Sequence, residues 1–392
     1  MPMTALASDR ALRGADSITD RLDAAIAATT FERPTLVLDL DIVSRNFQAL
    51  QRGLGDASIH YAVKANPAPQ VIERLAMLGC HFDAASRGEI ELCLSMGARP
   101  EHVSFGNTIK RATDIAFAHR AGITMFAADA EEELEKIAEH APGAQVYLRL
   151  IVEPTGADWP LTRKFGCAPA RAEGLLAYAR DLGLDAIGLS FHVGSQTRHA
   201  RMWSDTLNQV AATWHAVLAA GFDLRLLNIG GGFPAFHGDD VDPLEAYSRD
   251  VMDLVRARFG DAVQIMAEPG RGMVADAGAI AAEVLLVSRK SDDDLHRWVY
   301  LDVGRFSGLA ETEGEAIRYQ FETARDGDES GPCILAGPSC DSVDVLYEKR
   351  PVSLPVSLRA GDRVVIRNCG AYTSSYSSVG FNGFPPLDVM VI

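Results

Sequence analysis

The feature that most constrains the fold is a unit that repeats between residues 59 and 271. Each repeat has a short apolar stretch, a polar or glycine-containing turn, and a stretch rich in Ala, Leu and Glu that favours a helix. The eight predicted strands are 59–63, 81–85, 103–105, 124–127, 146–151, 187–192, 226–229 and 264–267. Alternating strands and helices form a parallel sheet, and eight such units match a closed (β/α)8 TIM-like barrel, which takes roughly 250 residues.

The pattern changes after Arg271, where apolar stretches are bounded by Gly, Pro and Asp and show little helical periodicity. A second, mostly β domain is expected there, with strands at 280–287, 298–301, 332–335 and 363–367. The strand-like segment 34–40 is expected to complete that domain. The predicted divisions are a loose or helical N-terminal extension at 1–30, a β-domain strand at 31–45, the barrel at 46–271 and the C-terminal β domain at 272–392.

Composition narrows the class of partner. The chain has 392 residues, 47% of them hydrophobic, which is enough to bury a large core. Its 53 acidic and 37 basic residues give a net charge of −16, which argues against nucleic acid or an anionic membrane and is compatible with a cationic small molecule. No apolar run approaches a membrane span, and the first thirty residues lack a signal peptide's apolar segment, so we expect a cytoplasmic protein.

The six cysteines are widely scattered and include no Cys-x-x-Cys pair. We therefore expect neither a metal site nor a disulfide framework. Five of them are predicted to be small buried apolar residues, namely Cys80, Cys93, Cys167, Cys333 and Cys369. The sixth, Cys340, has polar neighbours in Asp341 and Ser342.

Polar residues follow several barrel strands at the end where such barrels place their active sites. Segment 61–66, after the first strand, reads Tyr-Ala-Val-Lys-Ala-Asn. Burial of Lys64 there would favour the uncharged amine that attacks an aldehyde, although a lysine can equally extend its amine to solvent. His192, after the sixth strand, can stack on a flat ring, although a lone histidine is more often a satisfied core residue.

The seventh and eighth strands are followed by groups that suit an anion and a heterocycle. Segment 230–234 reads Gly-Gly-Gly-Phe-Pro and leaves backbone N–H groups open to an anion, without the Walker or dinucleotide spacing. Segment 268–271 reads Glu-Pro-Gly-Arg, whose carboxylate can pair with a protonated ring nitrogen and whose guanidinium can hold phosphate. A tight turn and an ion pair are the structural alternatives. Taken jointly, the strand-end residues predict a pyridoxal 5'-phosphate (PLP) site.

The sequence resembles a known family, the ornithine/diaminopimelate/arginine decarboxylase group of barrel-fold PLP enzymes, and within it a bacterial branch of the eukaryote-like ornithine decarboxylases. The resemblance spans about residues 34–392, and its motifs occur in the family's order. Besides the strand-end segments, they are Cys-Asp-Ser-Val-Asp at 340–344, Gly-Ala-Tyr-Thr at 370–373 and Phe-Asn-Gly-Phe at 381–384.

The resemblance implies a role for each motif residue. Lys64 resembles the family's Schiff-base lysine, and His192 the residue stacked on the cofactor. Glu268 is similar to the carboxylate that pairs with the pyridine nitrogen, and Cys340 to the general acid that protonates the carbon after CO2 leaves. The further cofactor-binding residues that it implies are Asp83, Arg149, Ser195, Gly230, Gly231, Gly232, Gly270, Arg271 and Tyr372.

The resemblance also implies a homodimer with shared active sites, because the family's Cys-Asp pair reaches into the neighbouring subunit. Asp341 is then expected to hold the distal ammonium of a basic amino acid, and Phe381 to contact the substrate. The Tyr-Asp pair of eukaryote-like ornithine enzymes is missing. Segment 306–313 stands in its place, and Glu311 is the candidate replacement.

The expected reaction is decarboxylation of L-ornithine to putrescine. Lysine stays open as a second substrate, because one methylene is worth only about 1 to 3 kcal/mol in a pocket. Diaminopimelate decarboxylase is the nearest alternative, favoured by Gln196 after the His192 motif but disfavoured by Asp341 and by the ornithine-like Gly-Gly-Gly-Phe-Pro segment. An amino-acid racemase is disfavoured by Glu268. A non-catalytic regulatory homologue, as antizyme inhibitors are, is disfavoured by the retained Lys64 and Cys340.

Overall fold

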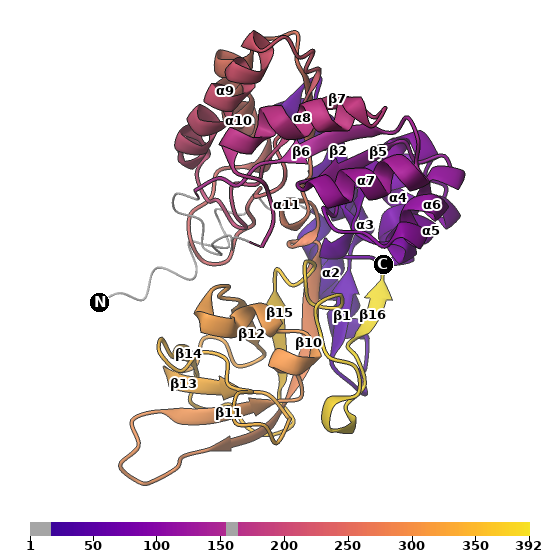
Figure 1. Ribbon diagram of the computed structural model, residues 1–392. Coiled ribbons are helices and arrows are strands. Elements are labelled where there is room, and N and C mark those ends of the chain that lie inside the picture. Colours follow the sequence, from indigo (N-terminus) through magenta and orange to yellow (C-terminus); the bar gives the residue numbers. More distant parts are fainter. Residues whose placement is uncertain (1–16, 154–163) are drawn as a thin grey trace. The chain divides into compact units, whose positions relative to one another are not determined.

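The computed structural model describes residues 17–153 and 164–392, which divide into two compact units (Figure 1). The barrel unit is Val43–Ala275. The β unit combines Met1–Ile42 with Asp276–Ile392. Among the described residues, no helix has both the length and the hydrophobicity that crossing a membrane requires.

The predicted (β/α)8 barrel is confirmed. Parallel pairing runs through all of its strands, and the last strand pairs with the first, which closes the barrel. Its strands are β2 (Ser58–Ala62), β3 (His81–Ala84), β4 (Val103–Phe105), β5 (Met125–Ala128), β6 (Gln145–Arg149), β7 (Asp185–Ser190), β8 (Leu226–Asn228) and β9 (Gln264–Ala267). Their ends differ from the predicted ends by at most two residues, so 150–151 and 191–192 belong to loops rather than to β6 and β7.

One helix precedes the first strand of the barrel and others follow its strands, and these helices lie outside the strands (Figure 1). They are α3 (Leu40–Leu54), which begins in the β unit, α4 (Pro69–Met77), α5 (Arg87–Ser95), α6 (Ala112–Arg120), α7 (Glu131–His140), α8 (Ala172–Asp181), α9 (Ser204–Ala219), α10 (Leu244–Phe259) and α11 (Arg271–Val274). Within the barrel, side chains of adjacent strands form one apolar cluster of Ala127, Tyr147, Ile187, Leu226 and Met266. The barrel is therefore a packed core, and a ligand must bind at its end.

Three histidine rings cluster where β2, β3 and β4 begin. The His60 ring lies 4.9 Å from the His81 ring, and His81 stacks on His102 with ring centroids 3.9 Å apart. Burial, followed by the charge of His81, lowers the pKa of His60 from 6.5 to about 3. Burial and the charge of His102 lower the pKa of His81 to about 4. Both rings are therefore neutral near pH 7.

This cluster predicts a loss of stability in mild acid. The unfolded chain binds a proton on His60 below about pH 6.5, whereas the folded chain does so only near pH 3, so stability falls with pH across that window. Between pH 6.5 and about pH 4.5 the contribution of His60 is a loss of about 2 kcal/mol. His60→Gln should reduce this loss when the free energy of unfolding is measured by urea titration. The exposed control His215→Gln should keep the wild-type pH dependence, and equal slopes for both variants would contradict the assignment.

The β unit contains one eight-stranded sheet. Its path is β12-β15-β10-β11-β13-β14, and β1 pairs antiparallel with β10 and parallel with β16. The strands are β1 (Thr35–Leu38), β10 (Gly278–Ser288), β11 (Arg297–Leu301), β12 (Gln320–Thr323), β13 (Ser330–Ala336), β14 (Val352–Pro355), β15 (Arg363–Arg367) and β16 (Asp388–Val391). The predicted completion of this domain by an N-terminal strand is confirmed.

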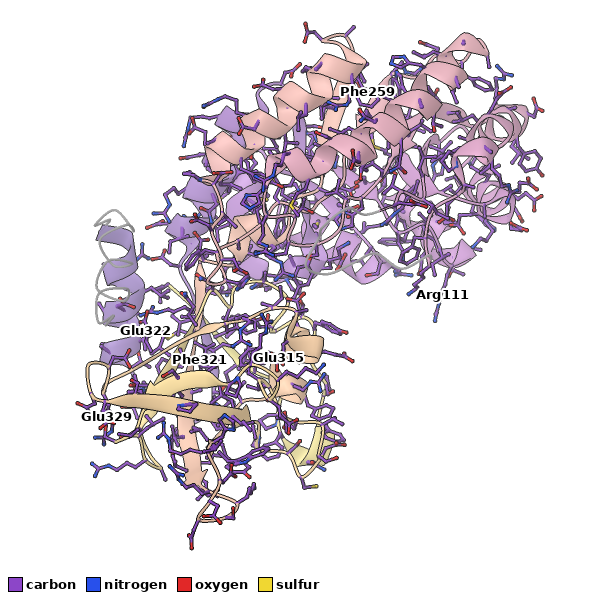
Figure 2. The ribbon with its side chains drawn as sticks, turned by 90° about the vertical axis from the view of Figure 1, so that its left-hand side faces the viewer. Arg111, Phe259, Glu315, Phe321, Glu322 and Glu329 are labelled. Carbon is purple, nitrogen blue, oxygen red and sulfur yellow. The ribbon has the colours of Figure 1, made fainter. Side chains whose placement is uncertain are left out.

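The N-terminal segment also supplies helix α2 (Ser17–Ala28), which buries Leu22 and Ile26 in a cluster with strands β1 and β10. At the β12 edge, Phe321, which is labelled in Figure 2, packs on Tyr347 with ring centroids 6.0 Å apart. Glu322 of the same strand accepts a hydrogen bond of 2.8 Å from Nε of Arg367. The β12 edge and the β1–β10 region of the sheet thus make side-chain contacts within the β unit.

Candidate active site

Lys64 follows β2 as the middle residue of a 3-10 turn, Val63–Ala65. The other two residues of this turn are buried. The turn is held by Tyr61, whose hydroxyl donates to the carbonyl of Asn66 over 3.0 Å. Lys64 itself is exposed, so of the two interpretations left open by the sequence the structure fits the lysine that extends toward solvent. Its positive charge nevertheless acts on the Asp83 and His192 side chains, which places it at the same end of the barrel.

Asp83 is a buried carboxylate at the end of β3, with 5% of its surface exposed. Burial raises the pKa of Asp83 well above its ordinary value, the charge of Glu268 raises it further, and the charges of Lys64 and Arg149 oppose the rise. Its Oδ1 has no hydrogen-bond partner within 17–153 and 164–392. Gly106 makes room for it, because a Cβ there would lie 1.8 Å from Oδ1 of Asp83.

Arg149 ends β6 and brings a second positive charge to this end of the barrel. Its guanidinium lies 5.3 Å from the ring centroid of Phe165. The neighbouring Tyr147 is buried, and burial raises its pKa well above the ordinary value, with Glu268 and Asp83 adding to the rise. The predicted residues Lys64, Asp83, Arg149 and Glu268 are therefore electrostatic neighbours, and Tyr147 joins them although the sequence gave no reason to single it out.

His192 lies two residues beyond β7. Burial lowers its pKa to about 3, and the charges of Arg149 and Lys64 contribute to the lowering. The imidazole is therefore neutral at physiological pH. Its Nδ1 is buried and makes no hydrogen bond to the part of the chain that the structure describes. A neutral flat ring at this position suits stacking on a heterocycle.

The glycine turn after β8 packs too closely for side chains. Gly230 and Gly232 have φ of +67° and +103°, which only glycine adopts readily. A Cβ would lie 2.3 Å from the Phe191 carbonyl oxygen at Gly230, 2.8 Å from the Glu268 carbonyl oxygen at Gly231, and 2.6 Å from Val193 at Gly232. Only glycine therefore fits at all three positions, and no side chain of these residues separates the backbone of the turn from an anion.

Gln196 fastens the loop after β7 to the glycine turn. Its side-chain amide donates to the carbonyl of Ala235, and its Oε1 accepts a hydrogen bond of 3.0 Å from the N–H of Ala235. The Thr197 N–H also donates to the carbonyl of Gly232 over 3.0 Å. Gln196 is thus bound to backbone, and its resemblance to diaminopimelate decarboxylases need not reflect a substrate contact.

Ser195 and Arg271 meet beside this turn. Nη2 of Arg271 donates to Oγ of Ser195 over 3.2 Å, and Arg271 is only 4% exposed. Gly270 precedes the arginine at the start of α11. The predicted phosphate ligands of the barrel unit, from the loops after β7, β8 and β9, are therefore brought to one place.

Glu268 follows β9 and is half-buried. Its N–H donates to the carbonyl of Gly230 over 2.8 Å. Its Oε1 accepts a hydrogen bond of 2.5 Å from Nδ2 of Asn228, a residue that sequence reasoning did not select. The signal that would have found Asn228 is a buried polar residue at the end of an apolar strand, directly before the glycine turn.

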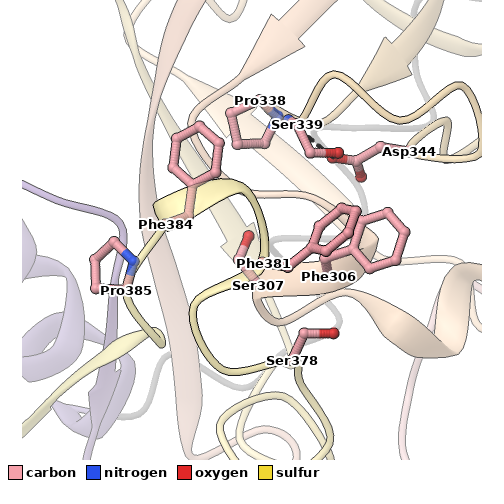
Figure 3. Close-up of a pocket in the computed structure, with 9 residues that line it drawn as sticks. All are labelled: Phe306, Ser307, Pro338, Ser339, Asp344, Ser378, Phe381, Phe384 and Pro385. Atoms are coloured by element: carbon pink, nitrogen blue, oxygen red, sulfur yellow. Dashed lines mark hydrogen bonds between the residues drawn. The ribbon is translucent and has the colours of Figure 1, made fainter.

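The remaining predicted residues lie in the β unit. Cys340 is exposed, whereas the other five cysteines are buried as predicted. Glu311, in the 3-10 helix Ala310–Glu315, is 6% exposed, and Tyr372 has φ of +56°. Phe381 packs on Phe306 with ring centroids 4.4 Å apart. These two rings help to line a small pocket of the β unit, whose nine lining residues are drawn in Figure 3.

The barrel-unit groups fit the parts of PLP. The exposed lysine suits the PLP aldehyde, and the neutral histidine suits its ring. The carboxylate suits the pyridine nitrogen, and the arginine and serine beside the glycine turn suit the phosphate. The orphaned Nδ1 of His192 and Oδ1 of Asp83 show that polar groups are aimed at this end without partners in the described chain. The fold and site thus define a barrel-fold PLP enzyme.

Comparison with known proteins gives the family. The model for the pyridoxal binding domain of pyridoxal-dependent decarboxylases matches residues 40–275. A lysine/ornithine decarboxylase from Selenomonas ruminantium is 34% identical over 353 residues, 90% of this chain and 87% of that protein. Antizyme inhibitor 2 from Xenopus laevis is 31% identical over 362 residues, 89% of this chain and 78% of that protein.

Solved structures agree. The lysine/ornithine decarboxylase from Vibrio vulnificus, complexed with cadaverine, superposes on this chain with a TM-score of 0.84 and is 31% identical in sequence. The superposition covers 95% of this chain and 98% of the Vibrio vulnificus chain. The chain belongs to the pyridoxal-dependent decarboxylase family. It is a PLP-dependent decarboxylase, as the sequence predicted.

The close approach of Gly106 to Asp83 gives a test of the site's construction. Gly106→Ala forces either the carboxylate or the loop after β4 to move, so we expect a lower melting temperature and about tenfold weaker PLP binding. Gly174→Ala in α8 is the matched control, because nothing lies within 4 Å of the added Cβ. Absorbance titration with PLP and thermal unfolding measure both effects. Wild-type PLP affinity in Gly106→Ala would contradict the expected role of Asp83.

Proposed function

We propose that this enzyme decarboxylates L-ornithine to putrescine and accepts L-lysine less well. The observation that carries the proposal is the position of Asp341, directly after the exposed Cys340. Its Oδ1 accepts a hydrogen bond of 3.0 Å from the N–H of Val343, which fixes the carboxylate in its turn. A fixed carboxylate suits the distal ammonium of a basic amino acid. Relatives named for lysine and ornithine support the same substrate class.

The loop that carries Cys340 and Asp341 is anchored by a buried carboxylate. Asp344 is 2% exposed and accepts hydrogen bonds from the Arg305 N–H over 2.8 Å and from the Ser339 hydroxyl over 2.7 Å (Figure 3). A Cβ at either Gly304 or Gly337 would lie 2.3 Å from this carboxylate. The loop therefore has little freedom to move, as a proton donor and a substrate ligand require.

Asn382 orients the cysteine. Its Oδ1 accepts hydrogen bonds from the Cys340 N–H over 3.1 Å and from the Cys340 thiol over 3.4 Å. Cys340 is proposed as the general acid that donates a proton to the substrate's α-carbon after CO2 has left. Phe381 and Glu311 are proposed to shape the substrate site, since Phe381 adjoins Asn382 and Glu311 belongs to the segment that replaces the Tyr-Asp pair.

The barrel residues are assigned to the cofactor. Lys64 is proposed to hold PLP covalently, His192 to stack on its ring and Glu268 to keep the pyridine nitrogen protonated. Asp83 and Arg149 are assigned to the surroundings of the lysine, and the phosphate is assigned to Ser195, Gly232, Arg271 and Tyr372. Gly230, Gly231 and Gly270 are assigned to the rest of the cofactor site. When bound, PLP would accept the electron pair that is left on the substrate's α-carbon when CO2 departs.

A homodimer is part of the proposal. Cys340 and Asp341 of one subunit are proposed to complete the site of the partner subunit, as the family resemblance implies. The exposure of Cys340 supports this assignment, because a donor that serves another subunit must lie on the surface. Residues 1–16 and 154–163 lie outside the described chain and receive no role.

Asp341→Asn tests the substrate assignment. Removing the charge should lower kcat/KM for ornithine by about 10- to 100-fold, because a charge-assisted hydrogen bond contributes about 1.5 to 3 kcal/mol. The exposed Asp293→Asn, also in the β unit, is the charge-matched control and should behave as wild type. CO2 release is measured from ornithine, lysine, arginine and meso-diaminopimelate. A preference for diaminopimelate, or no CO2 from any of them, would overturn the proposal in favour of the alternatives.

Subunit mixing tests the shared site. Lys64→Ala should lose both activity and the visible absorbance of bound PLP, whereas Cys340→Ala should keep the absorbance and turn over slowly with misplaced protonation. Random heterodimers of the two variants each carry one intact site, so a one-to-one mixture should recover about one quarter of wild-type activity. Heterodimers that form without recovered activity would show that each subunit has its own complete site.

A further inference from the structure

Asn228 occupies a position that joins two parts of the site. It is the last residue of β8, follows the apolar Leu226 and Leu227, and is 1% exposed. The glycine turn begins two residues later. A polar side chain so deeply buried must be satisfied by hydrogen bonds, and its partners show what it does.

The two branches of the Asn228 carboxamide bind different groups. Oδ1 accepts the N–H of Gly230 over 2.8 Å, and Nδ2 donates to Oε1 of Glu268 over 2.5 Å. The Glu268 N–H returns to the carbonyl of Gly230 over 2.8 Å. The three residues thus form a closed ring of hydrogen bonds between the loops after β8 and β9.

Only a carboxamide serves both partners. An ionised aspartate could still accept from Gly230, but it has no proton to donate and would place a second carboxylate against Glu268. An alanine would satisfy neither group. The turn has little room to shift in compensation, because even an added Cβ would lie 2.3 Å from the Phe191 carbonyl oxygen at Gly230 and 2.8 Å from the Glu268 carbonyl oxygen at Gly231.

We propose that Asn228 is a positioning residue that fixes the Glu268 carboxylate relative to the N–H groups of the glycine turn. It thereby sets the spacing between the group that meets the pyridine nitrogen and the groups that meet the phosphate. The inference rests on the proposed role of Glu268. In this proposal Asn228 contacts neither PLP nor the substrate itself. Its effect passes through Glu268 and Gly230.

Gln196 provides the matched control. Its side-chain amide binds the backbone of Ala235, directly after segment 230–234, and it is 2% exposed. In the described part of the chain, Gln196 makes no hydrogen bond to Glu268. Loss of the Gln196 side chain should therefore loosen the glycine turn alone. Loss of the Asn228 side chain should affect both the glycine turn and the Glu268 carboxylate.

The experiment compares Asn228→Ala, Asn228→Asp and Gln196→Ala in the full-length enzyme. PLP affinity and the visible absorbance maximum are measured by titration, and kcat, KM and their pH profiles are measured at saturating PLP. Both alanine variants should bind PLP about tenfold more weakly. Only Asn228→Ala should also shift the absorbance maximum and lower kcat by more than it raises KM.

Asn228→Asp separates the two contacts and guards against misfolding, because it is nearly isosteric. It should keep PLP affinity close to wild type at low pH, where the introduced carboxyl is protonated and still donates to Glu268. As pH rises this proton is lost, so PLP affinity and kcat should fall through an ionisation that wild type and Gln196→Ala lack.

The proposal is overturned if the Asn228 variants, at saturating PLP, have the absorbance maximum, kcat and pH profile of Gln196→Ala. The variant Glu268→Gln distinguishes failure of the positioning role of Asn228 from failure of the proposed function. If Glu268→Gln itself leaves the absorbance and kcat unchanged, the role of Glu268 is wrong. If Glu268→Gln changes them and the Asn228 variants do not, only the positioning role of Asn228 fails.

Discussion

Closure of the barrel is the constraint on which the site depends. Pairing of β9 with β2 brings residues about two hundred positions apart into one ring of strand ends, and the Ala62 N–H donates to the carbonyl of Pro269 over 3.0 Å across that seam. Lys64 and Glu268 each lie within two residues of this bond. An open sheet of the same strands would separate them to opposite edges, and no local interaction could restore the arrangement.

Crowding of charges is the second consequence of closure. Asp83, Glu268, Lys64 and Arg149 converge on one end of the barrel, where burial and the charge of Glu268 raise the pKa of Asp83 against the opposing charges of Lys64 and Arg149. His192 lies among them as a neutral ring, because the two cations and its own burial oppose protonation. The arrangement keeps a flat, uncharged face next to the groups proposed to bind a charged ligand, which is the combination that PLP requires.

Sequence reasoning succeeded where periodicity or motif identity carried the information. The barrel strands were found because they are apolar and evenly spaced, whereas β12, β14 and β16 were missed because each has four residues and partial exposure instead of clear alternation. The sequence does not mark the 3-10 turn Val63–Ala65, in which Lys64 is exposed between two buried residues. Asn228 and Tyr147 were missed because their importance comes from neighbours on other strands.

Side-chain amides recur as the groups that orient this enzyme's candidate functional residues. Asn228 binds Glu268, Gln196 binds the backbone of Ala235 directly after segment 230–234, and Asn382 binds Cys340. A carboxamide both donates and accepts while adding no charge. In a site where the pKa of Asp83 already responds to Glu268, Lys64 and Arg149, a further ionised side chain would add another charge to this balance. A neutral amide fixes geometry without that cost, which gives a physical reason for amides beside the proposed catalytic groups.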